Sequence, residues 1–154
     1  MHSHVRNNVK VVYRSLKDRE EGVGNPSDSV FVQADRDRIT QVISNLLDNA
    51  LKFTHQGVVS VAVSTTKEYK QGQEEGNEKE VVVSVEDSGS GIDPEIFPKL
   101  FTKFSSKSFS GTGLGLYISK SIIEAHGGKI WAKNNNDQKK PGATFCFTLP
   151  LAAT

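Results

Sequence analysis

The sequence contains one cysteine, Cys146, so the chain can form no internal disulfide bond and lacks the cysteine spacings of zinc sites. No apolar run approaches the roughly 18–20 residues that span a bilayer, and the first residues lack the apolar stretch of a signal peptide. Nineteen basic and eighteen acidic residues leave a net charge of +1, which argues against a cationic surface for nucleic acid. We therefore expect a cytoplasmic protein without direct membrane contact and without a nucleic-acid partner.

The composition that remains is typical of a folded domain: 154 residues, 36% of them hydrophobic and 24% charged. A chain of this length buries roughly 68–70% of its unfolded surface, which is enough for one core. It shows no internal repeat and no linker between domains, so we expect a single domain.

Short runs rich in valine and aromatic residues predict β-strands at 9–13, 30–32, 58–63, 81–85, 129–132 and 144–149. The polar, glutamate-rich stretch 67–80 between two of these strands predicts a long, mobile hairpin loop, with a partner site as the alternative interpretation.

Two segments have helical periodicity instead. Apolar residues from Ile39 to Ala50 recur at i, i+3, i+4, i+7, i+8 and i+11, with Asp35 as a candidate N-cap and Gly57 as a stop signal. A second helix is predicted at 114–126, where two glycines end it. The pattern predicts an α/β two-layer sandwich, a mostly antiparallel sheet with helices on one face.

Three polar residues share one face of the first predicted helix, beside its apolar stripe. Asn45, Asn49 and Lys52 lie at i, i+4 and i+7, within about 60° of one another. Amide oxygens suit a hydrated divalent cation, and an ammonium suits phosphate. The face indicates a site for metal and phosphate; a solvated polar edge with nothing bound is the other interpretation.

A carboxylate followed by alternating glycines comes directly after the strand at 81–85. The segment 87–92, Asp-Ser-Gly-Ser-Gly-Ile, offers an acceptor and close backbone approach to a flat ligand. Pro94 occupies the last glycine position of the dinucleotide-binding pattern, so the segment does not fit that fingerprint. A plain β-turn explains the segment equally well.

Three more glycines lie in the segment 111–116, Gly-Thr-Gly-Leu-Gly-Leu, at the start of the second predicted helix. Glycine costs roughly 1 kcal/mol in a helix relative to alanine, and phosphate oxygens bound to bare N–H groups supply a reason for it. The sequence has no P-loop pattern and none of the motifs of eukaryotic-type protein kinases.

In order and spacing, four segments resemble the N, G1, F and G2 boxes of sensor histidine kinases: 45–54, 87–92, 101–104 and 111–116. Residues 118–130 and 142–150 are similar to the C-terminal half of the same domain. The resemblance implies the Bergerat ATP-binding fold, with Mg-ATP held under a mobile lid. It implies residues 1–8 as a flexible N-terminal segment, 9–150 as the ATPase domain with its lid at 93–112, and 151–154 as a tail.

The resemblance also implies roles for single residues. Asp87 would accept the adenine amino group, Asn49 and Asn45 would hold Mg²⁺, Lys52 would contact a phosphate, and Thr144 would support adenine indirectly. The nucleotide-binding set that it implies is Asn45, Asn49, Lys52, Phe53, Asp87, Gly89, Gly91, Ile92, Lys103, Lys107, Thr112, Gly113, Leu114, Gly115, Leu116 and Thr144.

Two positions depart from the pattern of many relatives. Phe53 stands where they have tyrosine, and the nearest lid cations are Lys103 and Lys107 where they have arginine. Phenylalanine donates no hydrogen bond, and lysine lacks the bidentate fork of arginine. Phe101 and Phe104 would anchor the lid, a role compatible with plain core packing.

None of the four histidines has the context of a phosphoacceptor: His2 and His4 lie outside any helical pair, His55 lies in a turn, and His126 has a structural position. The resemblance therefore implies an acceptor histidine on a separate dimerisation domain, with a response regulator as an indirect partner. It implies that this domain is a monomer in isolation and belongs to the cytoplasmic portion of a sensor.

The function expected from this resemblance is the catalytic domain of a protein-histidine kinase that transfers the γ-phosphate of ATP. The clamp ATPases of the same fold carry a glutamate base where this chain has Asn45, and an amide cannot take a proton from water. A non-catalytic ATP-sensing module and a serine kinase on the same fold are the alternatives.

Overall fold

The structure, a computed structural model, describes residues 9–15, 31–54, 56–68, 71–72, 77–103, 114–135 and 141–152. Its elements are, in chain order, β1 (Val9–Ser15), α2 (Arg36–Phe53), β2 (Gly57–Glu68), β3 (Asn77–Asp87), the short 3₁₀ helix η1 (Phe97–Lys99), α3 (Gly115–Ala125), β4 (Ile130–Asn134) and β5 (Ala143–Pro150).

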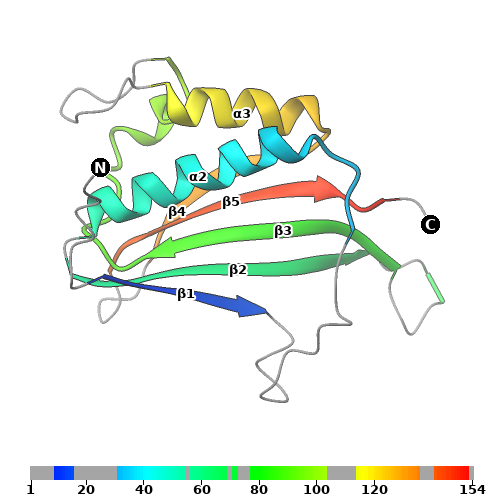
Figure 1. The fold of residues 1–154 in the computed structure, drawn as a ribbon, viewed down its shortest axis with the longest axis horizontal. Helices are drawn as coiled ribbons and strands as arrows, with labels where there is room; N and C mark the ends of the chain where they lie inside the picture. The colour runs from blue at the N-terminus through cyan, green and yellow to red at the C-terminus, as the bar shows by residue number, and fades with distance from the viewer. Residues whose placement is uncertain are drawn as a thin grey trace.

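The five strands form one sheet in the order β1-β2-β3-β5-β4, and α2 and α3 lie side by side over one face of it (Figure 1). The β1–β2 pair is parallel, and the other three pairs are antiparallel. The predicted two-layer α/β sandwich with a mostly antiparallel sheet is therefore confirmed. No helix in the described part of the chain is long and apolar enough to cross a membrane.

Helix α2 begins where the sequence predicts. The Asp35 side chain accepts hydrogen bonds from the N–H groups of Asp37 and Arg38, which leaves fewer orphan donors in the first turn. The predicted apolar stripe places Val42, Leu46 and Ala50 against the sheet, where all three are buried.

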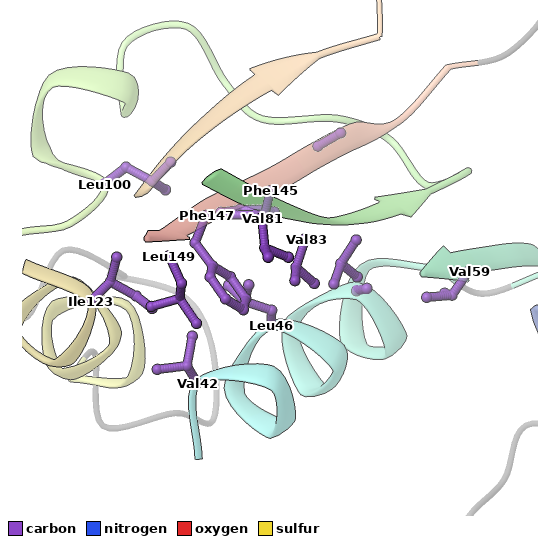
Figure 2. Packing of buried hydrophobic residues seen from close by; sticks show 13 residues of the cluster. Val42, Leu46, Val59, Val81, Val83, Leu100, Ile123, Phe145, Phe147 and Leu149 are labelled. Carbon is purple, nitrogen blue, oxygen red and sulfur yellow. The ribbon is translucent and has the colours of Figure 1, made fainter. Parts of the chain in front are cut away.

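The core lies between the helices and the sheet (Figure 2). Phe147 of β5 is at its centre and is fully buried, and it pairs across the sheet with Val83 on one side and Ile130 on the other. Leu46 of α2 and Ile123 of α3 reach this region from the helical layer. Helix α2 packs over β2 and β3 and helix α3 over β4 and β5, so the core holds the two helices over neighbouring parts of one sheet.

Helix α3 ends as the paired glycines predict. The Gly128 N–H donates to the Ile123 carbonyl at 2.9 Å and the Gly127 N–H to Glu124 at 3.0 Å, while Gly127 has a φ of 79°. This is a Schellman motif, in which glycine accepts the left-handed backbone.

His126 joins the two helices at this end. The Asp35 N–H donates to His126 Nε2 at 3.0 Å, and His126 Nδ1 lies 2.7 Å from the Ile122 carbonyl oxygen. These two contacts together require a proton on Nδ1 and a lone pair on Nε2 of the His126 ring. The structural position expected of His126 agrees with these contacts.

Three expectations about local structure are wrong. The predicted strand at 30–32 is reduced to a single bridge between Val32 and Leu151 among the described residues. The predicted loop at 67–80 is shorter, because β2 continues to Glu68 and β3 already begins at Asn77. Cross-strand pairing extends the strands into polar sequence that has no β pattern of its own.

The predicted helix stop at Gly57 is the third error. Helix α2 ends at Phe53 with Thr54 as its C-cap, and Gly57 instead begins β2 with a φ of 138°. A Cβ at Gly57 would overlap the Ser88 hydroxyl, so the glycine serves a close approach of β2 to the segment after β3.

The two leucines of α2 test how much of the stability comes from its buried stripe. Leu46 is fully buried and Leu51 is 38% exposed. We expect Leu46→Ala to lower the free energy of unfolding by about 2–5 kcal/mol, because it removes core contacts and leaves a cavity. Leu51→Ala, the same change in the same helix, should cost less than about 1 kcal/mol in chemical denaturation. Equal losses would contradict the orientation of α2.

Candidate functional site

The site is built around Asp87, the last residue of β3, whose side chain is only 4% exposed. Its Oδ1 accepts hydrogen bonds from the Gly89 N–H at 2.9 Å and from the Ala143 N–H at 3.2 Å. One N–H belongs to the segment that follows β3 and the other to the start of β5. The carboxylate is therefore held by two separate parts of the chain.

Burial raises the pKa of the Asp87 carboxyl above its ordinary value, because the ionised form loses water. The two backbone N–H groups oppose this shift, and the negative charge of Glu86 adds to it. A buried acceptor with a perturbed pKa makes Asp87 a candidate functional residue.

Close backbone packing surrounds Asp87. A Cβ on Gly89 would overlap the Phe53 carbonyl oxygen at the end of α2, and a Cβ on Gly142 would overlap the carbonyl oxygen of Asp87. Gly142 also has a φ of 128°, which favours glycine. The predicted residues Phe53, Asp87 and Gly89 are thus brought together, and Gly89 is needed for contact with α2.

Thr144 reaches Asp87 through an asparagine. Its Oγ1 donates to Asn135 Oδ1 at 2.7 Å, and Asn135 Nδ2 donates to the carbonyl oxygen of Asp87 at 3.3 Å. Thr144 is thus linked to the main chain of Asp87 through Asn135, a residue to which no motif in the sequence assigns a role.

Asn134 is the second residue that the sequence analysis did not identify. Its side chain forms two hydrogen bonds of 2.7 Å with the main chain of Ile92, one as acceptor and one as donor. The signal that could have found it is the run of three asparagines at 134–136, because asparagine is unfavourable in a strand. Such a run at a strand end indicates side chains that bond to backbone.

The polar face of α2 meets the start of α3. Asn45 Nδ2 donates to the Gly115 carbonyl at 3.2 Å and to Ser119 Oγ at 3.2 Å, and Ser119 Oγ donates to the same carbonyl at 2.8 Å. Ser119 is fully buried, so this triangle fixes the two helices against each other. Gly115 begins α3 as predicted, and Leu114 before it cannot cap the helix with an apolar side chain.

The remaining predicted positions lie in different parts of the structure or outside its described residues. Asn49 is half-buried and Lys52 exposed on α2, Ile92 and Leu116 pack against the core, and Gly91 lies near Asn134. Lys103 Nζ lies 5.0 Å from the centre of the Tyr117 ring, a cation–π contact. Lys107, Thr112, Gly113, Phe104 and His55, together with His2 and His4, lie outside the described residues.

The segment 93–112, predicted to be a lid, is described only from 93 to 103. Leu100 is buried there, and Phe101 is partly buried against the core. This contact of Phe101 with the core is compatible both with the predicted anchoring of the lid and with plain core packing.

Comparison with known proteins gives a match over most of the chain. The family model described as "Histidine kinase-, DNA gyrase B-, and HSP90-like ATPase" matches residues 34–153. The match includes every predicted site residue.

Two curated proteins show the same similarity. The sensor protein FixL of Bradyrhizobium diazoefficiens is 42% identical over 122 residues, which cover 79% of this chain and 22% of that protein. The sensor histidine kinase WalK of Bacillus subtilis is 36% identical over 132 residues, 81% of this chain and 20% of that protein. The chain spans about a fifth of the length of these relatives.

Solved structures agree with the fold. The nucleotide-free catalytic domain of the histidine kinase ThkA superposes with a TM-score of 0.67 at 32% identity, covering 93% of this chain and 80% of that one. Full-length ShkA in complex with AMPPNP gives a TM-score of 0.70 at 26% identity, covering 98% of this chain and 27% of that one.

The raised pKa of Asp87 makes a prediction about stability. Between the ordinary carboxyl pKa of 3.8 and the raised native pKa, the folded state holds a proton that the unfolded state has released. Stability attributable to this group therefore falls as the pH rises through that window and stays reduced above it. Asp87→Asn should then raise the melting temperature at pH 7, by about 2–4 °C for each kcal/mol relieved.

The gain should disappear near pH 3, where the wild-type carboxyl is protonated in both states. Glu95→Gln is the control, since this exposed side chain loses the same charge and is not among the groups that raise the pKa of Asp87. A melting temperature that falls at pH 7 in Asp87→Asn would contradict the assignment of a desolvated carboxylate.

Proposed function

Because the chain belongs to the family of histidine kinase-, DNA gyrase B- and HSP90-like ATPases, we propose that it binds Mg-ATP and donates the γ-phosphate to a histidine on a separate dimerisation and phosphoacceptor domain. The observation that carries the proposal is the contact between the polar face of α2 and the glycine start of α3, made by Asn45 and Gly115. This hydrogen bond brings the amide side chain of Asn45 next to the first turn of α3.

At the adenine end, Asp87 is the hydrogen-bond acceptor for the adenine base. Its Oδ1 is held by two backbone N–H groups, so the carboxylate is oriented before a ligand arrives. The carboxylate's capacity for four hydrogen bonds leaves it able to accept the exocyclic amino group of adenine. The ordered acceptor reduces the entropy lost on binding.

At the phosphate end, two sources of positive potential face the triphosphate. The first N–H groups of α3, from Gly115 onwards, have no partner within the helix and attract phosphate oxygens. Lys52 in the last turn of α2 supplies a full charge.

The donor atoms of α2 fit Mg²⁺, a hard cation that prefers oxygen ligands and keeps several waters. Asn49 offers its amide oxygen, and Asn45 uses its amide nitrogen toward α3, so that its oxygen is the atom available to a cation. The bound ion would neutralise charge on the triphosphate.

The nucleophile comes from the partner in this proposal. A ring nitrogen of the partner histidine forms a bond to the γ-phosphorus as the bond between that phosphorus and the β–γ bridging oxygen breaks, and ADP leaves. This chain contributes position and charge neutralisation, which dominate phosphoryl transfer. The response regulator would then receive the phosphoryl group from that histidine.

Nucleotide affinity tests the adenine and phosphate ends separately. Calorimetry with Mg-ADP should show at least a tenfold loss of affinity for Asp87→Asn, because the change replaces a hydrogen-bond acceptor by a donor toward the adenine amino group. Asn49→Asp should alter the Mg²⁺ dependence of binding more than it alters the fold. Asp48→Asn, an exposed change on the adjacent position of α2, is the control and should bind like wild type.

Turnover separates the kinase from the other functions of this fold. The chain alone should hydrolyse ATP far more slowly than ~1 s⁻¹ and should not phosphorylate itself, because the amide of Asn45 cannot activate water. Added to its own dimerisation domain, it should transfer ³²P to a histidine there, giving an acid-labile, alkali-stable product. Hydrolysis at ordinary enzyme rates would favour a clamp ATPase, and binding without transfer would favour an ATP-sensing module.

A further inference from the structure

We propose that Asn134 and Asn135 are positioning residues that hold the segment 87–92 in the backbone conformation that binds adenine. Both lie outside the motifs recognised in the sequence. The inference rests on the proposed function for the identity of the ligand. The latch itself, defined here as Asn134, Asn135 and their bonds to 87–92, rests on the geometry alone.

Asn134, at the end of β4, fixes the far end of the segment. Its Oδ1 accepts from the Ile92 N–H and its Nδ2 donates to the Ile92 carbonyl oxygen, both at 2.7 Å. Two bonds to one residue's main chain reproduce what a neighbouring strand does in a sheet. Ile92 therefore has its N–H and its C=O both satisfied by a single side chain.

Asn135 fixes the near end. Its Nδ2 donates to the Asp87 carbonyl oxygen at 3.3 Å, its Oδ1 accepts from Thr144 Oγ1 at 2.7 Å, and its own N–H donates to the Gly142 carbonyl oxygen at 2.9 Å. The asparagine is thus tied to both sides of the β4–β5 hairpin, which makes it a rigid support for Asp87.

Gly91 completes the latch. It has a φ of 83°, and a Cβ there would lie 3.0 Å from Asn134 Oδ1, closer than almost all real Cβ contacts. The glycine that the sequence analysis assigned to close approach of a ligand thus also admits the Asn134 side chain. Gly91 and Asn134 are expected to act as one unit.

The two asparagine side chains lie outside the apolar core. Asn134 and Asn135 are half-buried at the edge of the sheet, whereas Ile92, the residue that Asn134 holds, packs its side chain against the core. Replacing the asparagines removes hydrogen bonds and leaves the side chain of Ile92 in place, so we expect the change to stay local. A released segment would have to be ordered when the nucleotide binds, and that cost appears as weaker affinity.

The test compares three variants of the same 154-residue chain. Asn134→Leu keeps the branching and removes both bonds, while Asn134→Asp keeps the acceptor for the Ile92 N–H and places a carboxylate beside the Ile92 carbonyl. Lys133→Leu, an exposed change on the preceding residue of β4, is the control. With Mg-ADP as the calorimetric probe, we expect the affinity to fall at least tenfold in Asn134→Leu and by less in Asn134→Asp. The affinity of Lys133→Leu should stay within twofold of that of wild type.

Amide hydrogen exchange without nucleotide supplies a readout that does not depend on the ligand. The Ile92 N–H should exchange at least tenfold faster in Asn134→Leu, with the core amide of Val83 unchanged. Gly91→Ala should also accelerate exchange of the Ile92 N–H, because its Cβ would crowd Asn134 Oδ1 and its positive φ is unfavourable for alanine.

The outcomes separate the two proposals. If wild type fails to bind Mg-ADP but Ile92 exchange accelerates in Asn134→Leu, the proposed function is wrong and the latch stands. If wild type binds and Asn134→Leu binds equally well, the positioning role is wrong. Accelerated exchange at Val83 as well as at Ile92 would show general destabilisation and would also overturn it.

Discussion

The carboxylate of Asp87 is withdrawn from water at the end of β3, and most of the arrangement around it follows from the need to hold a buried charge. The N–H groups that bind it come from the segment after β3 and from β5, so both must approach the same oxygen. Neither Gly89 nor Gly142 has space for a side chain there, because a Cβ would overlap the carbonyl oxygen of Phe53 or of Asp87, respectively. The closely packed backbone thereby holds in place a carboxylate whose burial is unfavourable.

Helix α2 connects this carboxylate to the rest of the site. Its last residue, Phe53, presents a carbonyl oxygen to Gly89, and Asn45, two turns earlier, bonds to Gly115 at the start of α3. Because the helix is rigid and its buried stripe is set by Leu46 and its neighbours, the spacing between the two ends of the site is fixed by core packing. The relative position of Phe53 and Asn45 thus depends on the apolar contacts of the buried stripe.

The sequence predicted what periodicity and motif order encode. The stripe of α2, its Asp35 cap and the glycine stop of α3 are local signals, and all three agree with the structure. The segment 30–32 and the ends of β2 and β3 were not predictable, because they depend on which strands pair. Asn134 and Asn135 were not found for a related reason: their partners Ile92 and Asp87 are more than forty positions away in the sequence.

The parallel pairing of β1 with β2 has a consequence for the order of folding. Val9 pairs with Gly57, and the whole of α2 lies in the connection between them, whereas β3 begins at Asn77, close in sequence to the end of β2 at Glu68. Closing a long connection costs chain entropy before any contact compensates for it, so local hairpins form first. We therefore expect the β2–β3 hairpin, with α2 docked on it, to form early in folding. We expect strand β1 to join later and to open more readily than the other strands in native-state fluctuations.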